Sequence, residues 1–253
     1  MSENYLANPN LKKAYIPIEW TEEQVQEVIK CSKDINYFIK TYVKIINLDR
    51  GLINFEMYPF QEEMANMIAD NRFTVIKTCR QAGKTTTSAA VVLWHALFNE
   101  SYTVAILANK LSTAREILAR VQRAFEYLPK WLQQGVVVWN KTNMELENGS
   151  QIIAASTASS AIRGYSINFL YLDEFAFVPR NIQDDFFTSV YPTIISGTNT
   201  KVVITSTPTS NTPVSYLWST GSTANNIVGL CSGIYTLNIT DAVGCTIDTS
   251  ITI

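Results

Sequence analysis

The chain has 253 residues, of which 47% are hydrophobic, and a formal net charge of -2. This length and apolar content allow one sizeable core with a small appendage. The charge excludes a global basic field directed at nucleic acid, so any DNA contact would depend on a local patch. The polar residues 1–13 lack the apolar run of a signal peptide, and no stretch approaches the roughly 20 apolar residues of a membrane span. We therefore expect a cytoplasmic protein with no membrane partner.

Cysteine and histidine usage argues against a metal centre built from these residues. The four cysteines are scattered without a Cys-x-x-Cys pair, and the chain has one histidine, His95. Neither a zinc site nor a disulfide framework for the whole chain is expected. Because His95 lies in an apolar run with no visible partner, it fits a packed histidine better than a catalytic one.

The first fifty residues predict helices. Thr21 and Gln24 form a capping-box start for a helix through Cys31. Helical spacing then continues through Ile35, Phe38, Tyr42 and Ile45. We therefore expect residues 1–50 to form an N-terminal helical segment.

From residue 73 onward, predicted strands alternate with predicted helices. The strands are expected at 73–77, 102–108, 167–172 and 201–205, and the helices at 83–98 and around 117–128. Two short strands, 144–146 and 151–155, flank Asn148-Gly149, which is a strong hairpin signal. Such alternation predicts an α/β fold with a mostly parallel sheet covered by helices on both faces, over residues 51–209.

The composition changes abruptly after Lys201. Beyond this residue there is no Lys, Arg or Glu, and the remaining charges are Asp241 and Asp248. Runs at 234–239 and 246–253 have strand character, with a turn at 241–244 between them. We expect a separate β-rich tail over residues 210–253.

The predicted strand 73–77 leads into a loop and a helix that carry Gly83-Lys84-Thr85, the core of a Walker A element. Successive amides and the helix N-terminus would face the phosphates of ATP. Lys84 would reach the outer phosphates, and the Thr85 hydroxyl would be a ligand of Mg²⁺. Thr78 stands where the usual pattern has its first glycine, so a chance Gly-Lys-Thr at a helix start remains the alternative for this motif alone.

A second motif strengthens this interpretation. The apolar run 168–172 ends in Asp173-Glu174, as in a Walker B element. Asp173 would hold Mg²⁺ through water, and Glu174 would polarise the attacking water. An acidic turn after a strand is common, but both motifs in this order predict a P-loop NTPase of the ASCE (RecA-like) type.

Two further sets of residues are candidates for the nucleotide site. The hydroxyl residues Thr205, Ser206 and Thr207 end an apolar strand and could sense the γ-phosphate, or form only a turn. Upstream, Gln61 could read the adenine edge and a nearby aromatic ring, Tyr58 or Phe60, could stack on its face. Core aromatic residues at a helix start are the alternative explanation for that segment.

Residues 16–208 resemble the ATPase region of large terminase subunits of tailed double-stranded-DNA phages. The resemblance is carried by segments 37–39, 58–61, 80–85, 146–150, 161–164, 172–174 and 205–208, and a relaxed first Walker A glycine is typical of that family. It implies a DNA-packaging motor with ATP and Mg²⁺ as cofactors. Its implied partners are double-stranded DNA, a portal protein and a small terminase subunit, in a homo-oligomeric ring in the host cytoplasm.

The resemblance also implies residue roles. Gln61 would lie near the adenine, and Arg80 would contact the γ-phosphate and act in catalysis with Lys84 and Glu174. The ATP-binding residues would be Gln61, Arg80, Gln81, Ala82, Gly83, Lys84, Thr85 and Thr86. Thr85 and Asp173 would serve the metal, Thr205 to Thr207 would couple hydrolysis to motion, and Arg163 could act across a subunit interface.

The sequence departs from that family after Pro208. Large terminase subunits continue into a nuclease domain similar to ribonuclease H, and we see no matching set of carboxylates, so no nuclease activity is expected. Segments 216–221, 229–235 and 240–245 of the tail instead resemble short repeats of secreted bacterial gliding-motility adhesins, which would be extracellular and in which Cys231 and Cys245 could pair. The residues leave open whether this join is a natural fusion or a recombined or misjoined reading frame.

Two alternative functions remain at this stage. One is a helicase-like ATPase, which shares Walker A, an Asp-Glu box and a hydroxyl triplet, but needs a second RecA-like domain. The other is a non-catalytic nucleotide-binding fragment or fusion product whose tail is an interaction module. The segment after Thr207 discriminates among them, since a motor requires more sheet and a linker subdomain there.

Overall fold

The structure is a computed structural model that describes residues 3–47, 49–157, 162, 164–191, 197, 199–207, 215–224, 231–240 and 246–252. It divides into two compact units, Met1–Thr207 and Pro208–Ile253, called unit 1 and unit 2 below. No helix in the described part of the chain is long and apolar enough to cross a membrane.

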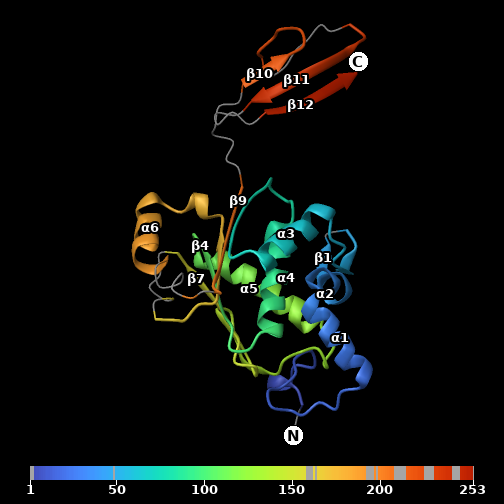
Figure 1. Cartoon of the computed structure of the whole chain (residues 1–253), viewed down its shortest axis with the longest axis vertical. Helices are drawn as coiled ribbons and strands as arrows, with labels where there is room; N and C mark the ends of the chain where they lie inside the picture. The colour runs from blue at the N-terminus through green and yellow to red at the C-terminus, as the bar shows by residue number, and fades with distance from the viewer. Residues whose placement is uncertain are drawn as a thin grey trace. The chain divides into compact units, whose positions relative to one another are not determined.

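Unit 1 is built around a seven-stranded sheet with the order β3-β9-β8-β4-β7-β6-β5. Figure 1 labels three of these strands, β4, β7 and β9. The first five strands are parallel, and the last two pair in antiparallel fashion. Their bounds are β3 Phe73–Lys77, β4 Thr103–Ala108, β5 Val136–Trp139, β6 Asn143–Leu146, β7 Gln151–Ser156, β8 Phe169–Asp173 and β9 Lys201–Ser206. The predicted α/β class with a mostly parallel sheet is confirmed, and β9 lies between the strands that carry the two Walker motifs.

Two buried clusters cover the two faces of this sheet. Along β4, Val104 and Ile106 belong to the larger cluster, whereas Ala105 and Leu107 belong to the smaller one. This alternation results from the two-residue period of a strand, and a strand buried on both faces is apolar throughout. The sheet is therefore sandwiched, as its continuous apolar strands predict.

Five helices contribute to the larger cluster, together with residues of the sheet. They are α1 Glu22–Lys33, α2 Ile35–Tyr42, α3 Pro59–Asp70, α4 Lys84–Phe98 and α5 Leu111–Glu126. α4 is buried along most of its length and contacts both α3 and α5. The smaller cluster is covered by short elements: the 3-10 turn η3 Phe175–Phe177, α6 Arg180–Asp185 and the π-helical turn η4 Phe186–Val190.

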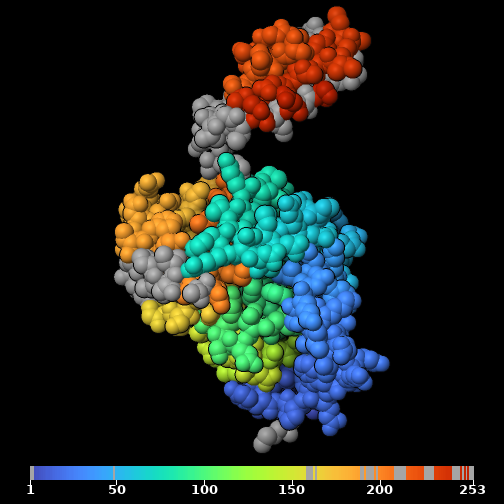
Figure 2. Space-filling model, viewed as in Figure 1, coloured from blue at the N-terminus to red at the C-terminus, as the bar shows by residue number. Residues whose placement is uncertain are grey.

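The N-terminal residues belong to the same unit. The capping box of α1 is present, with Thr21 and Gln24 exchanging side-chain to backbone hydrogen bonds. A short 3-10 turn, η1 Tyr5–Ala7, precedes it. Figure 2 shows these residues, in blue, forming a continuous surface with the cyan residues that come after them in the chain.

The helical spacing predicted through Ile45 is wrong at its last position. Helix α2 ends at Tyr42, and Ile45 lies in strand β1 Lys44–Asn47, which pairs with β2 Gly51–Asn54. Val43 already has extended backbone angles, and its amide donates the last helical bond to Ile39. Cross-strand pairing of Ile45 with Ile53 overrides the local helical spacing, as tertiary context often does for β-branched residues.

The hairpin predicted around Asn148-Gly149 is present. β6 and β7 are antiparallel, and Gly149 has a φ of 78°, a left-handed value that a glycine adopts without strain. The Asn148 amide donates to the carbonyl groups of Ala96 and Asn99, which fixes this turn against the end of α4.

Unit 2 is a three-stranded antiparallel sheet with the order β10-β11-β12. Its strands are β10 Ser215–Trp218, β11 Ile234–Thr240 and β12 Thr246–Thr252. Cys231 is an exposed free thiol, and Cys245, its suggested partner, is outside the described residues.

Candidate nucleotide-binding site

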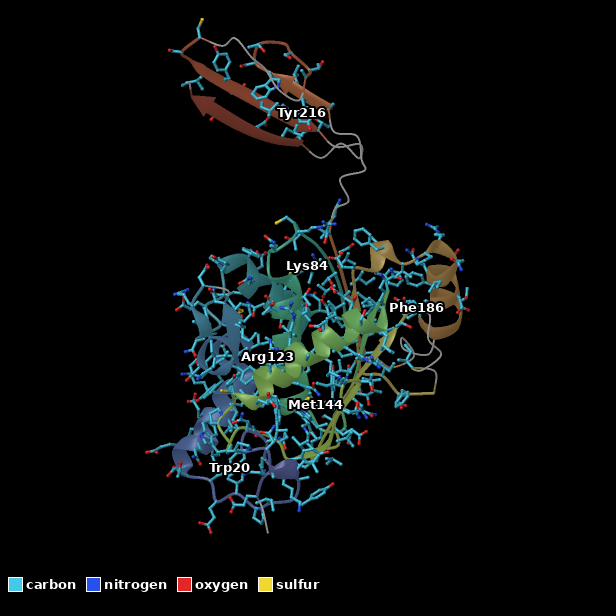
Figure 3. All side chains as sticks on the ribbon, turned by 180° about the vertical axis from the view of Figure 1, so that it is seen from behind. Trp20, Lys84, Arg123, Met144, Phe186 and Tyr216 are labelled. Carbon is cyan, nitrogen blue, oxygen red and sulfur yellow. The ribbon has the colours of Figure 1, made fainter. Side chains whose placement is uncertain are left out.

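The predicted Walker A loop connects β3 to α4 at one end of the sheet. Gly83 is the N-cap of α4, with a φ of 78°, and a Cβ there would come within 2.4 Å of the Gln61 Nε2 atom. The backbone conformation therefore favours glycine at position 83, and a side chain there would displace the Gln61 amide. Lys84 begins the helix at the end of unit 1 opposite to Trp20 (Figure 3).

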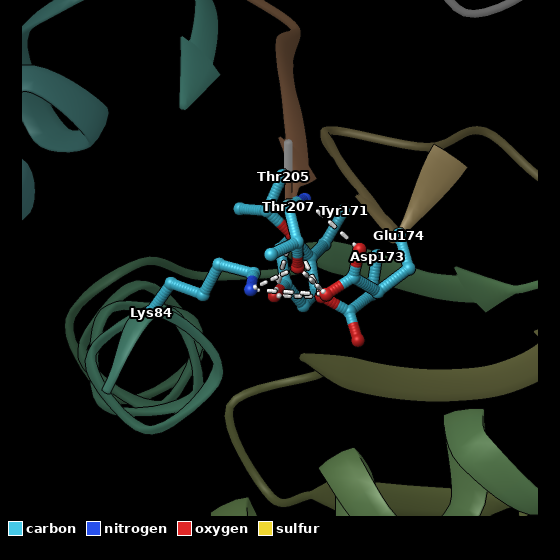
Figure 4. Close-up of polar contacts among 6 residues, drawn as sticks. All are labelled: Lys84, Tyr171, Asp173, Glu174, Thr205 and Thr207. Atoms are coloured by element: carbon cyan, nitrogen blue, oxygen red, sulfur yellow. Dashed lines mark hydrogen bonds and ion pairs between the residues drawn. The ribbon is translucent and has the colours of Figure 1, made fainter. Parts of the chain in front are cut away.

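Lys84 and Glu174 are in contact although they are far apart in the sequence. The Lys84 ammonium lies 2.9 Å from Glu174 Oε1 and donates a 2.8 Å hydrogen bond to the Thr207 hydroxyl (Figure 4). Thr207 in turn donates to Glu174 through its hydroxyl, at 2.5 Å, and through its backbone amide, at 3.0 Å. One residue from each of the predicted Walker A, Walker B and coupling motifs thus takes part in a single cluster.

This cluster keeps Glu174 charged. Burial alone would raise the pKa of the Glu174 carboxyl, but the Thr207 hydrogen bonds and the Lys84 charge outweigh it and hold the pKa below its ordinary value. Glu174 also has a φ of 49°, in the left-handed region that is uncommon for a non-glycine residue. Backbone strain of this kind is concentrated at functional sites.

Asp173 is held by two hydroxyl groups. Thr205 donates to Asp173 Oδ1 at 2.7 Å, and the Tyr171 hydroxyl donates to the same oxygen at 3.0 Å. The two hydroxyl oxygens are 3.1 Å apart. Thr205 is also the register partner of Asp173 in the adjacent strand, so backbone pairing of β8 and β9 brings these groups together.

Gln61 contacts the Walker A loop directly. Its amide oxygen accepts from the Tyr58 amide at 2.9 Å, and its amide nitrogen donates to the Ala82 carbonyl at 3.0 Å. Tyr58 and Phe60 are exposed and stack face to face, with ring centroids 5.8 Å apart. The amide nitrogen of Gln61 therefore contacts the loop, whereas its oxygen caps the start of α3, and the two rings are exposed beside it.

The remaining candidates make fewer contacts. Arg80 and Gln81 are exposed, and Arg80 has no ion pair with any residue that the structure describes. The Thr86 hydroxyl accepts from Arg120 of α5, whereas Thr85 is half-buried. Ser206, between the two site-facing threonines, has a buried hydroxyl with no hydrogen-bond partner in the described part. Arg163 lies outside the described residues.

The oxygen atoms of the candidate metal residues suit a Mg²⁺ ion that binds together with a nucleotide. The Thr85 hydroxyl and the Asp173 carboxylate are hard oxygen ligands, and Mg²⁺ commonly takes only one or two protein oxygens besides phosphates and water. Among the described residues there is no group of three or more His, Cys, Asp or Glu side chains that could hold a metal by themselves. The residues therefore fit Mg²⁺ shared with bound phosphates.

The sequence interpretation overlooked Tyr171. Strand alternation was a sufficient signal, because residues two positions apart share a face and Asp173 was already a candidate. His95 is buried beside Tyr102, and its Nε2 atom has no hydrogen-bond partner in the described region. Burial lowers the pKa of His95 to about 3, so this residue is a neutral, packed histidine.

Comparisons with known proteins show similarity to large terminase subunits in sequence and in fold. Residues 75–241 match the family model described as the N-terminal part of the T4likevirus-type terminase large subunit. The HK97 bacteriophage large terminase has a similar fold, with a TM-score of 0.58 and 19% identity over 69% of this chain and 37% of that chain. The family match continues past Thr207 into unit 2.

Two further solved structures are similar. The ATPase domain of the Thermus phage P74-26 large terminase gives a TM-score of 0.48 and 19% identity, over 57% of this chain and 64% of that chain. A large terminase from another thermophilic bacteriophage gives 0.48 and 14%, over 60% of this chain and 39% of that chain. This chain thus spans less than two thirds of each of these proteins.

Proposed function

The chain belongs to the N-terminal family of T4-type terminase large subunits, and from this premise we propose that it is an ATP-hydrolysing motor domain for packaging phage DNA. The observation that carries the proposal is the convergence of Lys84, Glu174 and Thr207 on one another, beside a buried Asp173. These four side chains come from three separate segments and supply the cation, the bases and the hydroxyl that phosphoryl transfer to water needs.

Nucleotide binding would rearrange this cluster. The triphosphate would lie along the loop from Arg80 to Thr86, where backbone amides at the start of α4 face an anion. Lys84 would exchange its contact with Glu174 for the outer phosphates, since a phosphate carries more negative charge than one carboxylate. Glu174, freed from the lysine, would then be able to accept a hydrogen bond from water.

Hydrolysis would depend on the protonation state of Glu174. A carboxyl group whose pKa lies below its ordinary value is ionised at neutral pH and orients the attacking water as a hydrogen-bond acceptor. Mg²⁺, held by Thr85 and Asp173 through oxygen, would neutralise charge on the phosphates when bound. Thr207 contacts both Lys84 and Glu174, so loss of the γ-phosphate would change its partners, which supports a coupling role for residues 205–207.

The wider assignments rest on the family. We propose ATP and Mg²⁺ as cofactors, and double-stranded DNA, a portal protein and a small terminase subunit as partners. The motor would act as a homo-oligomeric ring in the host cytoplasm, with Arg163 as a candidate for contact across the subunit interface. We further propose that residues 210–253 are a separate module with no part in hydrolysis.

The test compares the wild-type chain with Glu174→Gln. We expect Mg²⁺-dependent phosphate release by the wild type, and a loss of roughly 100-fold or more in the variant, because general-base assistance is removed. ATP affinity, measured by titration with a fluorescent analogue, should remain within a few-fold. Binding without turnover in the wild type would instead favour the non-catalytic alternative, and equal turnover by both proteins would remove Glu174 from catalysis.

A further inference from the structure

The Walker B strand carries a buried hydroxyl directly behind its metal-linked carboxylate. Tyr171 is fully buried in β8, and its side chain points to the same face as that of Asp173, two positions later. Its hydroxyl donates to Asp173 Oδ1 at 3.0 Å and lies 3.1 Å from the Thr205 hydroxyl (Figure 4).

These hydrogen bonds involve only one of the two oxygens of the Asp173 carboxylate among the described residues. Tyr171 and Thr205 both donate to Oδ1, and no residue in the described part of the chain donates to Oδ2. A hydroxyl that donates to a carboxylate forms a charge-assisted hydrogen bond, and the bond from Thr205, at 2.7 Å, is the shorter of the two.

We propose that Tyr171 is a positioning residue for nucleotide-bound magnesium: together with Thr205 it fixes Asp173 through Oδ1 and leaves Oδ2 for the metal's water. This inference rests on the proposed ATPase function and adds a residue to it. Residues that orient metal-linked groups through hydrogen bonds commonly change metal affinity by roughly 10–100-fold when they are replaced.

Thr205 and Thr207, two positions apart, hold the two neighbouring carboxylates. β9 carries Thr205, which holds Asp173, and two positions later the chain carries Thr207, which holds Glu174. One segment therefore fixes both Walker B carboxylates, and Tyr171 adds a contact between β8 and Thr205 of β9 inside the core.

A purely structural role makes a different prediction. Buried tyrosine hydroxyls generally need a hydrogen-bond partner, and Asp173 could serve only that purpose. In that case the loss of the hydroxyl would lower the melting temperature and leave the metal dependence unchanged. Metal dependence is therefore the measurement that separates the two roles.

The experiment uses the full chain with Tyr171→Phe, which keeps the ring and removes only the hydroxyl. Two quantities are measured: the Mg²⁺ concentration for half-maximal ATP hydrolysis, and Mn²⁺ affinity by electron paramagnetic resonance with a non-hydrolysable ATP analogue. We expect both to worsen by roughly 10-fold or more, with metal-free nucleotide affinity within twofold. Tyr102→Phe is the matched control, because Tyr102 is a partly buried tyrosine that stacks on His95 and makes no contact with Asp173.

A second pair of variants keeps the inference testable if Tyr171→Phe does not fold. Thr205→Val should reproduce the weaker Mn²⁺ binding, and Thr205→Ser, which restores the hydroxyl, should recover it. Unchanged Mn²⁺ affinity in both Tyr171→Phe and Thr205→Val, with normal wild-type ATP turnover, would overturn the inference and leave the proposed function standing. A wild-type chain that neither binds Mn²⁺ with the analogue nor hydrolyses ATP would overturn the proposed function first, and this inference with it.

Discussion

Units 1 and 2 differ in how their sheets are covered. The sheet of unit 1 has a buried cluster on each face, and every ion pair in the described part of the chain lies in this unit. In unit 2, Trp218 and Leu237 are the buried hydrophobic residues among those described, each 8% exposed. Among the described residues of unit 2, no helix or second sheet covers the three strands, so the unit itself shields little of their apolar surface from water.

This difference indicates where the free energy of folding comes from. Unit 1 can bury large side chains such as Phe38 and Phe125 completely, and apolar burial is the main favourable term in folding. Unit 2 is a segment of the size that usually needs a disulfide, a metal or a partner for stability. Every described contact of the candidate nucleotide site lies within unit 1, so the comparison predicts that changes in the two units have separate consequences.

The largest effect is expected from Lys84→Ala. Removing the ammonium deprives the outer phosphates of charge-assisted hydrogen bonds, each contributing about 1.5–3 kcal/mol. ATP affinity should fall by roughly 100-fold or more, measured by titration with Mg²⁺-ATP. Thermal unfolding is the control, because Glu174 loses its ion-pair partner and only a folded variant is informative. An affinity within a few-fold of wild type would exclude Lys84 from phosphate binding.

A pair of core substitutions tests the independence of the units. Phe38 is fully buried and packs edge-on against Phe98, with ring centroids 5.5 Å apart. Phe38→Ala should reduce the free energy of unfolding of unit 1 by about 3–5 kcal/mol, measured by chemical denaturation. Trp218→Ala, the matched change in unit 2, should leave that transition unchanged. Equal shifts from both substitutions would show that the two units unfold as one.

Acid should destabilise unit 1 through His95. Its folded pKa of about 3 lies below the ordinary value of 6.5, so the unfolded state takes up a proton that the folded state excludes. The contribution of neutral His95 to the free energy of unfolding is therefore complete above pH 6.5. It is lost as the pH falls toward 3, by up to about 1.4 kcal/mol per pH unit. At pH 5 the loss should be about 2 kcal/mol.

His95→Phe provides the corresponding measurement. The phenyl ring can keep the stacking on Tyr102, whose ring centroid is 5.4 Å away, and it removes the titrating group. The difference in stability between pH 7 and pH 5 should shrink by about 2 kcal/mol in denaturant titrations. Since His95 is the sole histidine, an unchanged pH dependence would assign the acid sensitivity to carboxyl groups.

The smallest effect is expected from removing the tail. Truncation after Thr212 should leave ATP affinity within a few-fold, because every described contact of the site is made at or before Thr207. Solubility should improve, since exposed strand edges promote association; size-exclusion profiles of both proteins would show this. Loss of nucleotide binding would mean that residues 213–253 contribute to unit 1, in agreement with the extent of the family match.

Local signals determined much of unit 1. Strand β3, the start of α4 at Gly83 and the turn at Asn148-Gly149 depend on short-range chemistry, and each was predictable from the sequence. The Walker motifs were recognisable for the same reason, because their residues are adjacent in the chain. Strand β1 shows the limit: Ile45 has a helical spacing in the sequence, and only pairing with Ile53 made it part of a strand.

The tertiary structure decided which side chains meet. No sequence pattern shows that Lys84 contacts Glu174. Their contact depends on the strand order, which brings the start of α4 and the ends of β8 and β9 together at one end of the sheet. The hydrogen bonds of Tyr171 and Thr205 to Asp173 likewise require the register between β8 and β9. The sequence by itself predicted which groups are candidates for the site, whereas long-range strand pairing, which depends on the whole core, determined their partners.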